Sequence, residues 1–147
     1  MDKLEHTIWE KALKLLSLRA HSRQELKTKL AARFPEHPDA VASALDELER
    51  VELLNDRRFT ELFIASLIQR PIGRIKIGVE TRRRGLNPEL VDQWLLNLNW
   101  NEIDSARRAL DEKNRTLREV DPRKRKMKLV NFLRSRGFRE ATIYKVI

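Results

Sequence analysis

The chain has 147 residues, no cysteine and a formal charge of +9 at pH 7. The absence of cysteine excludes disulfides, thiolate nucleophiles and cysteine-based zinc sites. No apolar run approaches the roughly 20 residues that a transmembrane helix needs. With only 4 Gly and 5 Pro, and with 36% charged residues, the composition favours helices with a highly charged surface.

The positive charge is concentrated toward the C-terminus. Residues 1–54 hold 9 Lys/Arg and 10 Asp/Glu, residues 55–98 hold 8 and 5, and residues 99–147 hold 14 and 7. Such asymmetry favours a polyanionic partner over a protein that is merely basic and has no such partner.

Helix signals begin at the N-terminus. Residues 7–18 place apolar side chains on one helical face. Residues 22–25 form a capping box that predicts a second helix from Arg23, which the Phe-Pro pair at 34–35 ends. Asp39 is expected to cap the third helix.

The middle of the chain predicts three further helices. Residues 55–56 offer an N-cap for a helix that runs from about 57 to 69, and residues 71–73 break it. The next helix is expected to end on Gly85, a residue suited to the left-handed conformation after a helix. An Asn-Pro-Glu sequence at 87–89 then begins the sixth helix.

The C-terminal third predicts helices seven to nine. The seventh covers about 102–117, the eighth begins at the Asp-Pro pair 121–122 and ends on Gly137, and the ninth begins near Glu140. No segment alternates apolar and polar residues long enough to indicate a strand.

One short pattern occurs three times. Residues 77–86 and 129–138 share apolar positions followed by Arg-Gly and a large apolar residue, and residues 26–35 repeat the pattern with Phe-Pro at its end. A period near 50 residues indicates one supersecondary unit used repeatedly. We therefore predict an all-α fold of three tandem three-helix, helix-turn-helix-like repeats, elongated in shape. The expected units are residues 1–54, 55–99 and 100–147.

The sequence contains no arrangement typical of an enzyme. The three histidines, His6, His21 and His37, are scattered and have no metal-ligand spacing. Phosphate-loop and nucleophile-elbow motifs are absent, and most acidic residues lie three or four positions from a Lys or Arg, as in solvated ion pairs. We expect no catalysis, no metal and no cofactor.

Two basic clusters remain as candidate binding sites, because Lys and Arg side chains can neutralise phosphates. Four basic positions match between the second and third repeats, which favours a function over a merely solubilising surface. Few aromatic residues lie among them, so backbone contact is favoured over base stacking. Trp100 either packs two repeats together or lies exposed. The candidate residues are Arg74, Lys76, Arg82, Arg83, Arg84, Arg123, Lys124, Arg125, Lys126, Lys128, Arg134 and Arg136.

Four segments in order resemble the RecX family, regulators of the RecA recombinase. They are an Ala-Leu-led segment with His-Ser-x-x-Glu-Leu at 12–30, Leu-Leu-Asn-Asp-x-Arg-Phe at 53–59, a Gly-led segment at 73–86, and Phe-Leu-x-x-Arg-Gly-Phe at 132–138. Together they span nearly the whole chain. The departures from the family pattern concern turns and packing: Glu52 where the family has Gly, Thr81 where it has Leu, and Pro71-Ile72 before Gly73.

The resemblance implies a curved body and a cytoplasmic bacterial protein without catalysis or cofactor. It implies a monomer that binds the RecA–single-stranded DNA filament and inhibits its extension, ATPase and strand exchange. Duplex DNA would bind more weakly, no membrane would be involved, and the role would belong to recombination, DNA repair and the SOS response.

A stand-alone helix-turn-helix-like transcriptional regulator is the alternative. Such a protein would act as a dimer that reads half-sites one helical turn apart. The chain lacks an obvious dimerisation segment, and three units in a row suit a filament groove better.

Overall fold

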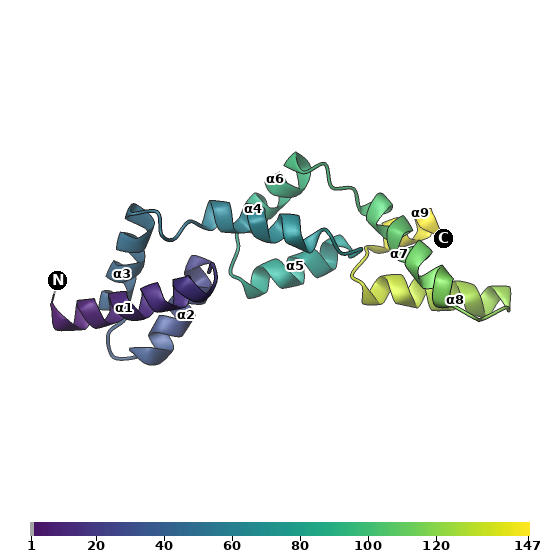
Figure 1. The fold of residues 1–147 in the computed structure, drawn as a ribbon. Helices are drawn as coiled ribbons and strands as arrows, with labels where there is room; N and C mark the ends of the chain where they lie inside the picture. Colours follow the sequence, from purple (N-terminus) through teal and green to yellow (C-terminus); the bar gives the residue numbers. More distant parts are fainter. Residues whose placement is uncertain (1) are drawn as a thin grey trace.

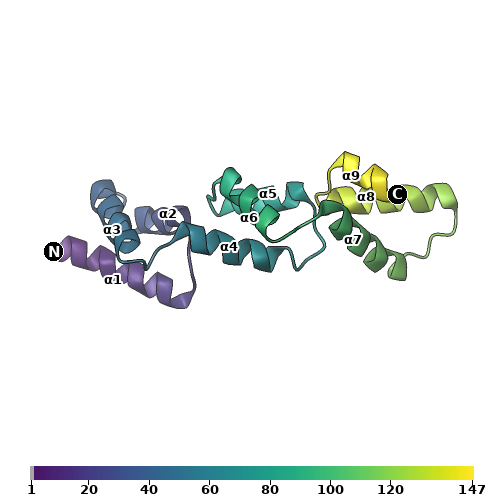
Figure 2. The ribbon, with the colours of Figure 1, turned by 90° about the horizontal axis from the view of Figure 1, so that it is seen from above.

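The structure, a computed structural model, describes residues 2–147, and over that range it contains nine helices and no strand. Contacts between the helices group them into three successive three-helix units, which follow one another along an elongated body (Figures 1 and 2). The predicted all-α repeat fold is thereby confirmed. The helices are α1 (Lys3–Leu18), α2 (Arg23–Arg33), α3 (Pro38–Arg50), α4 (Asp56–Leu67), α5 (Arg74–Arg83), α6 (Pro88–Asn97), α7 (Glu102–Thr116), α8 (Pro122–Ser135) and α9 (Glu140–Val146).

Local capping explains where the first helices begin. Asp2 and Glu5 form a capping box, so α1 begins at Lys3 and not near residue 7 as predicted. The expected cap of α3 is wrong: this helix begins at Pro38, His37 at its N-cap makes no side-chain bond, and Asp39 lies inside the first turn. Proline at this position fits because its missing N–H needs no partner there.

Each unit buries its own apolar cluster, as expected for repeats that pack mainly within themselves and on their neighbours. The first cluster is Ile8, Ala12, Leu26, Leu30, Val41, Leu45, Leu48 and Leu54. The second is Ile64, Leu67, Ile72, Ile77, Leu86, Val91 and Leu95. The third is Ala106, Ala109, Leu110, Val130, Leu133, Phe138 and Ile143.

The corresponding helices of the three units line up along the molecule. In Figure 1 the third helices α3, α6 and α9 follow one long edge, and the middle helices α2, α5 and α8 follow the opposite edge. Figure 2 shows the first helices α1, α4 and α7 along a third edge. Because equivalent helices share an edge, any property common to them extends along the whole body.

Candidate nucleic-acid and partner interface

The middle helices are stacked end to end. The N–H groups of Gly73 and Ile75, at the start of α5, donate to the carbonyls of Arg136 and Gly137 at the end of α8, at 2.9 and 3.0 Å. The carbonyl oxygens that follow α8 thus accept from two N–H groups at the start of α5, which satisfies part of the free backbone groups there and aligns the two helix dipoles. At the other end of α5, the Arg84 carbonyl accepts from the Ser22 hydroxyl at the start of α2.

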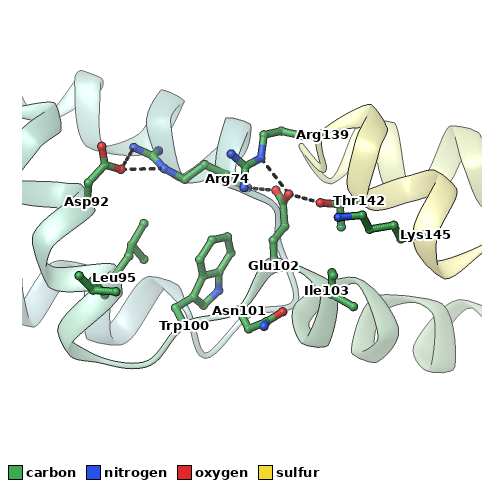
Figure 3. Close-up of a pocket in the computed structure, with 11 residues that line it drawn as sticks. Arg74, Asp92, Leu95, Trp100, Asn101, Glu102, Ile103, Arg139, Thr142 and Lys145 are labelled. Carbon is green, nitrogen blue, oxygen red and sulfur yellow. Dashed lines mark hydrogen bonds and ion pairs between the residues drawn. The ribbon is translucent and has the colours of Figure 1, made fainter.

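Glu102 fixes the junction between units two and three (Figure 3). Its carboxylate accepts from the Arg74 N–H at 2.7 Å, from Arg139 Nε at 2.9 Å and from the Thr142 hydroxyl, while its side chain is only 4% exposed. Burial raises the pKa of Glu102, but the hydrogen bonds from Thr142, Arg74 and Arg139 outweigh that effect and lower it below its usual value. Glu102 therefore stays ionised and links three helices.

The junction between units one and two repeats this design. Asp56, the first residue of α4, accepts from the Arg23 N–H at 2.7 Å, just as Glu102 at the start of α7 accepts from Arg74. Glu25 adds bonds to Arg19 at 2.9 Å and Arg84 at 2.8 Å. Burial raises the pKa of Glu25, but bonds from Arg19, the Ser22 N–H and Arg84 outweigh it and lower the value to about 2.

The charges are segregated by helix class. The middle helices are basic: α8 has six Lys/Arg and no acidic residue, and α2 and α5 have four Lys/Arg and one Glu each. The third helices are not: α3 has one Arg and four acidic residues, α6 has two acidic residues and no cation, and α9 has one of each. The stacked middle helices α2, α5 and α8, here called the basic edge, thus extend along the body.

Seven of the twelve predicted site residues make an ion pair or a side-chain hydrogen bond inside the protein. Arg74 is bound to Asp92 at 2.7 Å, as Arg23 is to Asp46 in the first unit. The others bind acidic residues, aromatic rings or loop carbonyls. They are Lys76 and Arg83 near Glu80, Arg84 with Glu25 and over the Phe63 ring, Arg125 with Leu117, Glu119 and Asn114, Lys128 near Glu119, and Arg134 with Glu140.

The side chains of the other five make no ion pair and no hydrogen bond within residues 2–147. Arg82 lies exposed near the end of α5, and Arg136 covers the Phe132 ring at 4.8 Å from its centroid. The remaining three form the exposed basic start of α8: Arg123, Lys124 and Lys126. The structure therefore leaves three residues of the second cluster exposed side by side at the start of α8, whereas Arg74 and Arg84 of the first cluster take part in the junctions.

Sequence reasoning overlooked two cations of the basic edge and the two acidic residues that fix the junctions. Lys27 and Arg33 extend the basic edge along α2, and Arg33 lies where Arg84 and Arg136 do in the repeated pattern. The junction acids could have been found from a second repeat, Asn-Asp at 55–56 and Asn-Glu at 101–102. That repeat has a different period, because the connections between helices vary in length.

Trp100 packs against the second apolar cluster and lines the cleft at the junction with unit three. Of the two possibilities left open by the sequence, packing between repeats describes it better than full exposure. Among the described residues, no group of His, Asp and Glu side chains could hold a metal ion. No described helix is long and apolar enough to span a bilayer.

Tandem three-helix units with one basic edge define the class of this molecule as a helical-repeat protein. Family models place the chain more closely: the first three-helix domain of RecX matches residues 9–48, the second matches 55–95 and the third matches 101–147. The chain belongs to the RecX family. Its relatives' shared name supports a regulatory role for it.

Relatives and solved structures agree with this assignment. The regulatory protein RecX of Chlorobaculum tepidum is 36% identical over 137 residues, which cover 92% of this chain and 83% of that protein. The one from Chromohalobacter salexigens is 37% identical over 142 residues, 94% and 89% of the two chains. The RecX crystal structure from Lactobacillus salivarius has a TM-score of 0.78 at 19% identity and covers 97% and 93%, so it shows the shared fold.

Proposed function

We propose that this protein binds the RecA–single-stranded DNA filament and inhibits its extension, its ATPase activity and strand exchange. It would thereby modulate recombination and DNA repair as a monomer, with weaker binding to duplex DNA. Membership of the RecX family supports a regulatory role, and the RecA partner follows from what that family is expected to regulate.

The basic edge is the observation that carries the nucleic-acid part of this proposal. Its cations lie on three stacked helices, so an extended polyanion could follow them from unit to unit. Binding of this kind releases counterions and is independent of base sequence. The side chains that we assign to phosphate contacts are Lys27, Arg33, Arg82, Arg123, Lys124, Lys126 and Arg136.

The transcriptional-regulator alternative fits the charges less well. In a helix-turn-helix, the second helix of the pair enters the major groove. Here that helix would be α3, α6 or α9, and the first two carry more acidic than basic residues. Phosphates would repel them, whereas a regulator of transcription needs that helix to approach the DNA most closely.

A titration into a RecA ATPase assay on single-stranded DNA tests the regulatory part. We expect ATP hydrolysis to fall at substoichiometric ratios of this protein to RecA, and strand exchange to fall with it. An unchanged ATPase rate at every ratio, together with sequence-specific binding to duplex DNA, would favour the transcriptional regulator.

A charge-reversal series tests the basic edge. Replacing Arg123, Lys124 and Lys126 by Glu should weaken binding to single-stranded DNA and flatten its salt dependence, because each lost phosphate contact lowers the log–log slope by about 0.7. The matched control reverses Lys3, Lys11 and Lys14 on α1, which changes the net charge equally. If both triple variants lose the same affinity and slope, net charge and not the basic edge governs binding.

A further inference from the structure

A cleft of about 440 Å³ lies at the junction of units two and three, on the side of the third helices (Figure 3). Its residues come from α6, from the start of α7 and from α9, with Arg74 reaching in from α5. The basic edge contributes only that arginine, which Asp92 already neutralises. The cleft therefore lies almost entirely outside the basic edge.

One wall of the cleft is apolar. Leu95, Leu96 and Trp100 line it, and Leu96 is 77% exposed. Covering so exposed a leucine with a partner's apolar side chain would be favourable, because it removes apolar surface from water. The wall suits one large apolar side chain.

The opposite wall is cationic. Arg139 gives its Nε–H to Glu102, but its terminal amino groups have no partner among the described residues, and Lys145 has none either. A guanidinium has five N–H donors, so Arg139 retains several for a ligand. An incoming carboxylate could bind Arg139 and Lys145 together while an apolar neighbour covers Leu96.

This cationic wall is particular to the second junction. With the 52-residue shift that relates units two and three, the counterparts of Arg139 and Lys145 are Asn87 and Gln93, which are uncharged. Arg139 and Lys145 are therefore not cations that units two and three share through their common repeat pattern.

A nucleic acid fits this cleft poorly. Arg139 and Lys145 would attract a phosphate as readily as a carboxylate, but a sugar–phosphate backbone has no large apolar group that would cover Leu96. The Trp100 ring is packed against the second apolar cluster and is not free to stack on a base. A protein segment with a carboxylate beside a large apolar side chain complements both walls.

We propose that this cleft, lined by Leu96, Trp100, Arg139 and Lys145, docks an acidic–apolar peptide segment of the filament's protein subunits, while the basic edge holds DNA. The inference rests on the proposed function, because it assumes that the partner is a protein–DNA filament. It adds a division of labour: the third-helix side binds protein and the middle-helix side binds nucleic acid.

The test compares two affinities for each variant: co-sedimentation with the preformed RecA–single-stranded DNA filament, and fluorescence anisotropy with free single-stranded DNA. Leu96→Asp and Lys145→Glu should each weaken filament binding at least tenfold and leave the affinity for free DNA within twofold. Lys145→Arg should retain filament binding, because it keeps the cation.

Matched surface changes far from the cleft serve as controls. Leu18 on α1 is 76% exposed, close to the value for Leu96, so Leu18→Asp introduces the same change at a remote site. Lys14→Glu, also on α1, is the matching control for Lys145→Glu, because it reverses one exposed lysine charge far from the cleft. Equal losses in these controls, or unchanged filament binding in the cleft variants, would overturn the proposal. A parallel loss of free-DNA affinity in the cleft variants would assign the cleft to nucleic acid instead. Failure of the unmodified protein to bind the filament would reject the proposed function itself.

Discussion

Glu52 and Asn99 occupy the same place in units one and two, just beyond the third helix. Both have positive φ angles, 62° and 56°. The following N–H groups of Leu53 and Trp100 bond back to Leu48 and Leu95, each at 2.9 Å, which closes the helix end. Asn tolerates the left-handed conformation, whereas Glu is strained there by its Cβ. The glutamate noted in the sequence as a departure from the family's glycine is therefore a local strain.

Glu52→Gly should stabilise the protein by about 1 kcal/mol, because glycine has no Cβ to clash in this conformation. The midpoint of urea unfolding measures the change. The same substitution in a regular helical turn gives the control: Glu112→Gly in α7 should destabilise by about 1 kcal/mol. Changes of the same sign in both variants would show that strain at residue 52 is negligible.

Glu25 makes the first junction sensitive to acid. Its folded-state pKa of about 2 lies below the ordinary 4.5, so ionised Glu25 stabilises the folded state above pH 4.5. That stabilisation is lost as the pH falls from 4.5 toward 2. Glu25→Gln should cost about 1–3 kcal/mol at pH 7, since the bonds involve charged groups, and the difference from the unmodified protein should shrink toward pH 2.

Chemical unfolding at a series of pH values measures this difference. Glu36→Gln is the control, because Glu36 is exposed and has no ion pair among residues 2–147. If the loss in free energy of unfolding caused by Glu25→Gln stays constant between pH 7 and pH 2, the charge of the Glu25 carboxylate does not stabilise the junction.

At the scale of elements, the glycine after α8 serves both its own helix and the packing of unit three against unit two. Gly137 has a φ of 80°, and the Phe138 N–H bonds back to Leu133 at 3.1 Å, so the predicted left-handed helix end is confirmed. A Cβ at this position would also lie 2.5 Å from the backbone nitrogen of Lys76 in α5. The close approach of α8 to α5 therefore requires glycine.

Gly137→Val should destabilise the protein by more than the 1–2 kcal/mol that the left-handed conformation alone costs, because it also separates α8 from α5. Gly78→Ala is the opposite control: a Cβ there would meet only the end of Arg74, at 3.4 Å, so helix propensity should stabilise by about 1 kcal/mol. Melting followed by circular dichroism compares them. An unaltered melting temperature in Gly137→Val would contradict the stacked arrangement.

At the scale of the molecule, the three units differ in what they contribute. Residues 99–147 hold 14 Lys/Arg and 7 Asp/Glu, hence most of the formal charge. The second unit nevertheless uses the third, because Glu102 and the end of α8 bind the start of α5, and Trp100 packs on the second cluster.

A chain ending after Trp100 should keep the helices of units one and two but unfold at lower urea, since α5 loses its partners from unit three. Its binding to single-stranded DNA should lose about half of its salt dependence, because Arg123, Lys124, Lys126 and Arg136 are removed and Lys27, Arg33 and Arg82 remain. Circular dichroism and anisotropy at several salt concentrations measure the two effects. Retention of the full salt slope by the shortened chain would place the DNA contacts in the first two units.

The sequence by itself determined the local structure of this protein. Apolar spacing and caps at the Ser22–Glu25 box, Asn55 and Gly137 act within a few residues, so they specify helices and their ends directly. The period near 50 residues then determined that one unit is repeated, and the four motif segments pointed to the family that the comparisons show.

Only the tertiary structure decided which charges are used internally and which face solvent. Glu102 looks like an ordinary helix-start acid until folding brings it to Arg74, 28 positions earlier, and to Arg139, 37 positions later. The basic edge likewise exists only because the end of α8 meets the start of α5, and the end of α5 meets the start of α2. Contacts between residues far apart in the chain depend on how the units pack, and no local pattern encodes them.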